Sequence, residues 1–178
     1  MPRELMSLKA PEQSQPRDPG VKVSFKVFLS HSGADRPWAE WIARRATQVG
    51  IEVYLYEHDP KPGVPIAEKI QGAIQNSDAL VVLLTPAGAS SAYVQQEVGY
   101  ASAFQRLVIP LVWPGIQRGS LAMLEGKEWV PFDPSNPDQA LFRMLEYMVA
   151  VKTKKEAAQA LLALGGLIIT AFALSGKN

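Results

Sequence analysis

The sequence of 178 residues contains no cysteine, which excludes disulfides, a thiol nucleophile and cysteine-based zinc sites. Its only two histidines, His31 and His58, lie far apart in the chain and argue against a histidine metal site. Lysine and arginine (18) nearly balance aspartate and glutamate (17), so the basic surplus of a nucleic-acid-binding protein is missing. Neither GxGxxG nor GxxxxGKS/T occurs, so no glycine-rich phosphate loop is indicated. We therefore expect no bound cofactor, no metal and no nucleic-acid partner.

The first 20 residues also lack the apolar run of a secretory signal and are rich in Pro, Gln, Arg and Ser. This composition is typical of a disordered segment, which we predict for residues 1–20. The length allows one ordinary domain, which we place at residues 21–151. Residues 152–178 then form a basic linker and a hydrophobic C-terminal helix.

Apolar runs typical of strands alternate with segments that have helical periodicity. The run Ala79 to Leu84 is wholly apolar, as in a central parallel strand that is covered on both faces. This alternation predicts an α/β sandwich with a mostly parallel sheet. The strands are expected at residues 21–29, 51–56, 79–84, 107–113 and 129–132, and the main helices at residues 35–49, 65–75, 91–104 and 134–151, with a short helix at residues 117–126.

Parallel sheets of this class bind ligands at the carboxyl ends of their strands. Four segments follow strands at that edge: Ser30-His31-Ser32, the loop 57–63, the small-residue loop 85–91, and Trp113. His31 could contact a substrate or simply order its loop, and Trp113 could form a wall of a pocket or pack in the core. The polar and aromatic groups of these segments are expected to converge.

Glu97 lies near the start of a predicted helix that faces the same edge, one helical turn after Tyr93. Residues four apart share one face of a helix, so the carboxylate and the aromatic ring should lie side by side. Val94, Val98 and Ala101 form the adjacent apolar stripe, which predicts that Glu97 is half-buried at a rim. Glu97 is the candidate catalytic residue, and the alternative is a solvated surface glutamate.

Five segments in order resemble the conserved boxes of Toll/interleukin-1 receptor (TIR) domains. They are Lys26 to Ser32 (KVFLSHS), Asp59 to Gly63 (DPKPG), Ser77 to Thr85 (SDALVVLLT), Ser91 to Val98 (SAYVQQEV) and Ile109 to Leu111 (IPL). The resemblance covers about Val23 to Val151. It implies a flavodoxin-like three-layer sandwich with a five-stranded parallel sheet in the order 2-1-3-4-5.

Many bacterial TIR domains cleave NAD+ at the nicotinamide–ribose bond, and others only assemble as signalling adaptors. The resemblance therefore implies an NAD+ nucleosidase of the bacterial type, giving ADP-ribose or a cyclic isomer and acting in immune or antiphage defence after self-assembly. The alternatives are an inactive adaptor and an enzyme similar to nucleoside deoxyribosyltransferases.

The family's catalytic glutamate matches Glu97, and Tyr93 stands where the family usually has Trp. Ser30, His31, Ser32, Tyr93 and Trp113 are the implied substrate contacts, with Lys61 as a possible phosphate contact. The loop residues Asp59, Pro60, Pro62 and Gly63 are expected to mediate homotypic association.

The C-terminal run Ala157 to Leu174 has no charged residue and follows the basic cluster Lys152 to Lys155. At 1.5 Å per residue it would reach about 27 Å, close to the hydrocarbon thickness of a bilayer. The positive cluster would remain cytoplasmic. This pattern indicates a cytoplasmic domain with a tail anchor, and the alternative is a helix buried in an oligomer.

Overall fold

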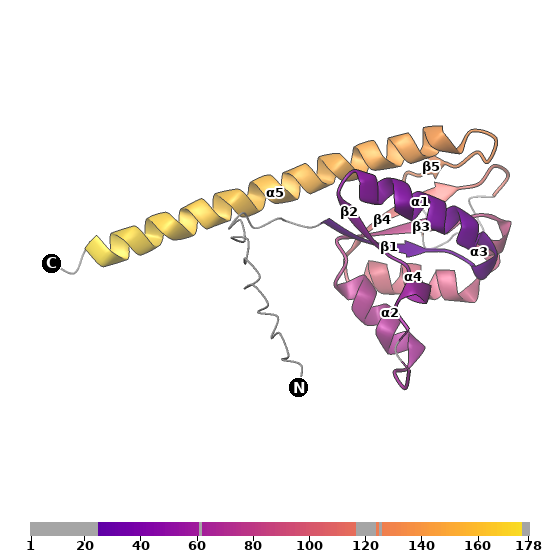
Figure 1. Ribbon diagram of the computed structural model, residues 1–178, viewed down its shortest axis with the longest axis horizontal. Helices are drawn as coiled ribbons and strands as arrows, with labels where there is room; N and C mark the ends of the chain where they lie inside the picture. Colours follow the sequence, from indigo (N-terminus) through magenta and orange to yellow (C-terminus); the bar gives the residue numbers. More distant parts are fainter. Residues whose placement is uncertain (1–24, 61, 117–123, 125, 176–178) are drawn as a thin grey trace, which may run out of the picture.

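The protein forms an α/β sandwich with one long helix that extends beyond it (Figure 1). The computed structural model describes residues 25–60, 62–116, 124 and 126–175, with side chains described up to residue 162. The sheet contains five parallel strands in the order β2-β1-β3-β4-β5, which confirms the predicted topology. The strands are β1 (Phe25–Ser30), β2 (Ile51–Tyr54), β3 (Ala79–Leu84), β4 (Leu107–Val112) and β5 (Val130–Pro131).

Helices cover both faces of the sheet, and Figure 1 shows α1 and α5 on one side and α2 and α4 on the other. Every residue of β3 is buried, because this strand is central and helices pack on both of its faces. The helices are α1 (Arg36–Gln48), α2 (Ile66–Gln75), α3 (Pro86–Ser90), α4 (Ala92–Ala103) and α5 (Pro137–Ser175), with 3₁₀ turns η1 (Gly33–Asp35) and η2 (Tyr56–His58).

Two separate clusters of buried side chains form the core, one on each face of the sheet. Phe25, Leu29, Phe132 and Met144 belong to the cluster under α1 and α5. On the other face, Phe28 and the buried residues of α2 and α4 form the second cluster. Trp38 and Trp41 pack against the first cluster, as their helical spacing predicts.

Helix α5 runs without a break through the segment expected to be a linker and projects far from the sandwich (Figure 1). Lys155 Nζ lies 2.7 Å from Asp78 Oδ1, and Lys152 Nζ donates to the carbonyl oxygen of Gly50 at 3.1 Å. These contacts fix the middle of the helix to the domain. Beyond them, Leu161 and Leu162 are 70% and 76% exposed.

Among the helical residues that the structure describes, no segment combines the length and the apolar character needed to cross a membrane. The expected tail anchor includes residues 163–174, whose side chains lie outside the described set. The predicted disordered segment at residues 1–20 and most of the predicted helix at residues 117–126 also fall outside the described residues.

Candidate functional site

A cavity of about 230 Å³ lies at the carboxyl edge of the sheet, where the loops after β1 and β2 meet the beginnings of α2 and α4. Because these segments are far apart in the sequence, only the parallel topology brings them together. Glu97 and Tyr93 contribute from α4, as predicted. The lining residues are His31, Ser32, Gly33, Tyr56, Ile66, Ile70, Ser91, Tyr93 and Glu97.

The Glu97 side chain is buried, with the residue only 4% exposed, so the predicted half-buried rim position is wrong. Ser30, the last residue of β1, donates a hydrogen bond from Oγ to Glu97 Oε2 at 2.5 Å. Ser91 caps the amino end of α4, with Val94 N–H donating to Ser91 Oγ at 3.4 Å. The cap fixes the start of the helix, and Ser30 orients the carboxyl group that the helix carries.

Burial raises the pKa of Glu97 from its ordinary value of 4.5 to about 7. The hydrogen bond from Ser30 acts in the opposite direction, since it stabilises the charged form, and the nearby Glu57 carboxylate adds to the rise. The carboxyl group therefore exchanges its proton near neutral pH. A strongly raised pKa in a cleft is a recognised property of functional carboxyl groups.

His31 and Glu57 form a second polar pair beside the cavity. The Nε2 atom of His31 lies 3.1 Å from Glu57 Oε1, although it is not aligned for a hydrogen bond to any described residue. Its Nδ1 atom lies 3.2 Å from the carbonyl oxygen of Leu29, which fits a hydrogen bond from the Nδ1–H tautomer. His31 is 5% exposed, so it packs as a wall residue.

Tyr56 is a wall residue that sequence reasoning missed, since it stood at the end of a predicted strand. Its ring lies 6.4 Å from the His31 ring, and the residue lines the cavity. Burial and then the carboxylate of Glu57 raise the pKa of Tyr56, so its hydroxyl stays protonated at neutral pH. The only sequence signal was its position two residues after β2, at the carboxyl edge.

Asp35 connects the loop after β1 to the loop after β3. Its Oδ2 accepts hydrogen bonds from Ser32 Oγ at 2.5 Å and from Thr85 Oγ1 at 2.7 Å. Asp35 occupies the N-cap position of α1, but its carboxylate makes no capping bond there and instead joins two loops. Thr85 also caps α3 by accepting from Gly88 N–H at 3.0 Å, so the predicted loop 85–91 is largely a short helix.

We expect Gly88→Ala to lower the free energy of unfolding by about 1–3 kcal/mol, as overpacking does in tight interiors. A β-carbon at Gly88 would overlap the carbonyl oxygen of Leu83 and lie 3.5 Å from Asp35 Oδ2. Urea denaturation measures the change. Gly72→Ala is the matched control, because a β-carbon there meets nothing within 4 Å and alanine favours the helix. Equal effects of the two substitutions would contradict the expectation.

The remaining predicted site residues do not all reach the cavity. Tyr93 lines its mouth but is 71% exposed. Trp113 does not line it: the ring packs 6.2 Å from Trp38 and 5.9 Å from Phe132, on the opposite face of the sheet. The prediction that Trp113 forms a wall of this pocket is therefore wrong. Lys61 lies outside the described residues.

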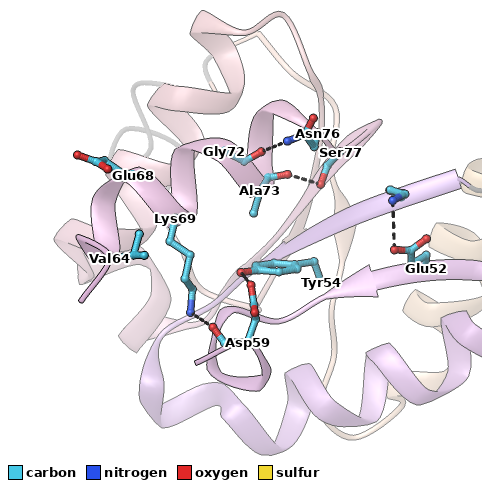
Figure 2. Close-up of a pocket in the computed structure, with 11 residues that line it drawn as sticks. Glu52, Tyr54, Asp59, Val64, Glu68, Lys69, Gly72, Ala73, Asn76 and Ser77 are labelled. Carbon is cyan, nitrogen blue, oxygen red and sulfur yellow. Dashed lines mark hydrogen bonds and ion pairs between the residues drawn. The ribbon is translucent and has the colours of Figure 1, made fainter. Parts of the chain in front are cut away.

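A larger groove of about 460 Å³ shares no lining residue with the Glu97 cavity. Figure 2 shows it between β2, α2 and the loop that contains Asp59. Tyr54 donates from Oη to Asp59 Oδ2 at 2.9 Å, and Lys69 reaches over the same loop. Pro60, Pro62 and Gly63 of the predicted association loop are exposed.

The fold and the site thus define a flavodoxin-like α/β domain with a buried carboxyl group under a cavity at the carboxyl edge of its sheet. The TIR domain family matches residues 27–145, about two thirds of the chain, and the chain belongs to this family.

One relative is a protein of Brachypodium distachyon, named a probable 2′ cyclic ADP-D-ribose synthase. It is 26% identical over 96 residues, which are 53% of this chain and 43% of the relative. The match therefore spans less than half of that relative.

Solved structures share the fold. The TIR domain of the Toll-related receptor TRR-2 from Hydra magnipapillata has a TM-score of 0.56 at 20% identity, covering 67% of this chain and 97% of that chain. The CMP N-glycosidase BcmB of Clostridium botulinum has a TM-score of 0.50 at 17% identity, with the same two coverages.

Proposed function

We propose that the protein cleaves the nicotinamide–ribose bond of NAD+, with Glu97 as the catalytic residue. The observation that carries the proposal is the placement of Glu97, which is buried beneath a cavity at the carboxyl edge of the sheet and oriented by Ser30. Membership of the TIR family and the name of the Brachypodium relative support NAD+ as the substrate.

The chemistry needs few groups. Nicotinamide in NAD+ is already a cation, so it can leave as a neutral molecule without a general acid. The bond breaks to give an oxocarbenium-like centre on the ribose. A fixed carboxylate in a site that excludes water stabilises this developing positive charge far better than water does. Glu97 provides that charge in its ionised form, and Ser30 holds its orientation.

The walls of the cavity fit one end of a dinucleotide. At about 230 Å³ the cavity is smaller than the roughly 300–1,000 Å³ of most ligand pockets, so it holds the nicotinamide riboside end and leaves the adenosine end outside. The aromatic rings of Tyr56 and Tyr93 flank this space and offer faces for the base. His31 and Ser32 complete the wall next to Glu97.

The fate of the ribosyl cation depends on what reaches it first. Water gives ADP-ribose, and attack by a group from the adenosine end gives a cyclic isomer. The name of the Brachypodium relative favours the cyclic product for this chain as well.

Self-association is the second part of the proposal. Val64 and Ile66 next to the association loop are 43% and 62% exposed, so this surface offers apolar area for a second copy of the chain. The same surface would serve a signalling adaptor without activity. An adaptor, however, has no use for a buried carboxyl group with a raised pKa.

The experiment is to incubate the full chain at high concentration with NAD+ and to measure released nicotinamide by chromatography. We expect nicotinamide together with ADP-ribose or its cyclic isomer, which mass and retention time distinguish. A parallel reaction with a deoxynucleoside and a second free base tests the alternative of an enzyme similar to nucleoside deoxyribosyltransferases. Absence of nicotinamide from a concentrated, assembled sample would refute the proposal and favour the adaptor.

A further inference from the structure

Lys69 of α2 connects the helix to the loop after β2. Its Nζ atom donates to the carbonyl oxygen of Tyr56 at 2.7 Å and to that of Asp59 at 2.5 Å. The same atom lies 5.7 Å from the centre of the Tyr56 ring. Figure 2 shows the side chain extending from α2 to Asp59 along the edge of the larger groove. One ammonium group thus contacts both ends of the turn η2.

Among the described residues, two backbone hydrogen bonds close the turn that contains these carbonyl groups. His58 N–H donates to Leu55 O at 3.1 Å, and Asp59 N–H donates to Tyr56 O at 3.4 Å, which is a long bond. A charged donor makes a stronger hydrogen bond than a neutral one, so the two bonds from Lys69 add stability to the turn. The bond from Tyr54 Oη to Asp59 Oδ2 fixes the loop from its other side.

The turn that Lys69 stabilises carries part of the wall of the Glu97 cavity. Tyr56 lines the cavity from η2, and Ile66 and Ile70 line it from α2, on either side of Lys69 in the sequence. Lys69 itself lines the larger groove and not the cavity. It therefore holds two walls of the cavity at a fixed separation while its own side chain stays outside.

We propose that Lys69 is a positioning residue, which ties η2 to α2 and thereby holds the Tyr56 ring where the substrate base packs. The expected effect on NAD+ cleavage rests on the proposed function, whereas the expected effect on the order of the loop does not. An ordered loop spares the substrate the cost of ordering it, so the lysine acts on substrate binding rather than on the bond-breaking step.

The test compares Lys69→Met, Lys69→Arg and Lys154→Met. Methionine keeps the length and helix preference but removes the donor, whereas arginine keeps a charged donor. Lys154 is an exposed lysine of α5 and controls for the loss of one positive charge. For Lys69→Met we expect the KM for NAD+ to rise about 3- to 10-fold with kcat within about twofold of the wild type, since one loop must now be ordered on binding. Lys69→Arg should recover most of the change.

Amide hydrogen exchange on the protein without NAD+ provides the readout that is independent of activity. The amides of His58 and Asp59 should exchange faster in Lys69→Met than in the wild type and in Lys154→Met. Unchanged exchange would overturn the proposal whether or not the wild type cleaves NAD+. Faster exchange with no cleavage by the wild type would leave the loop contact standing and refute the proposed function instead. An increase in kcat/KM in Lys69→Met would also overturn the positioning role.

Discussion

Replacing Glu97 with glutamine is expected to lower the rate of nicotinamide release from NAD+ by about 10²- to 10³-fold, the range seen when one preorganised stabilising group is removed. Glutamine has nearly the same shape and can still accept the hydrogen bond that Ser30 donates to Glu97 Oε2. It cannot carry the negative charge that the oxocarbenium-like centre requires. The loss should appear in kcat, because the charge matters most when the bond breaks.

The matched control is Glu128→Gln, the same chemical change at an exposed residue just before β5, at the amino edge of the sheet. This variant should cleave NAD+ at the wild-type rate.

The wild type should also become more active as the pH rises through about 7, since the raised pKa of Glu97 sets where the carboxyl group ionises. Equal rates in Glu97→Gln and the wild type would remove Glu97 from the mechanism.

The fold could be predicted because its strongest determinants are local. Apolar runs such as Ala79 to Leu84 and the periodic helices between them predict a parallel sheet, whereas the strand order 2-1-3-4-5 came from the resemblance to TIR domains. The helix boundaries depend in part on contacts between distant segments. The short helix α3 consists of small residues that resemble a loop, and it is fixed by the contact between Thr85 and Asp35, residues 50 apart in the sequence.

The candidate site was only partly predictable, because burial depends on what covers a helix face. Periodicity predicts that Glu97 lies half-buried at the rim of the apolar face of α4. In the structure, the end of β1 and the loop after β2 cover this position. Tyr56, Ile66 and Ile70 enter the cavity from separate segments, and no local pattern relates them to Glu97.

The position of Trp113 follows from the alternation of side chains along β4. Ile109 and Leu111 face the cluster under α1 and α5, whereas Val108 and Val112 face the cluster on the side of Glu97. Since side chains alternate along a strand, position 113 falls on the face away from the cavity. The same alternation places Ser30 with Phe28, on the face where Glu97 lies.

The burial that raises the pKa of Glu97 also destabilises the folded protein. An acid whose pKa is higher in the folded state than in the unfolded state binds its proton more tightly when folded. Its contribution is therefore most favourable below the unfolded pKa and is lost as the pH rises through the folded pKa. For Glu97 that window runs from 4.5 to about 7, and the two values correspond to about 3 kcal/mol.

We therefore expect Glu97→Gln to raise the free energy of unfolding by about 2–3 kcal/mol at pH 8 and to have a much smaller effect at pH 5. Urea denaturation of both proteins at several pH values between 5 and 8 measures this change. Subtracting the free energy of unfolding of the wild type from that of the variant cancels the contribution of groups that titrate alike in both proteins. Glu40 and Asp133, whose pKa values are lowered, titrate below this range. If the substitution were equally destabilising at both pH values, burial would not raise the pKa of Glu97 in the folded protein. A more stable but inactive variant would show that the fold accepts a less stable core in order to keep this carboxylate under the cavity.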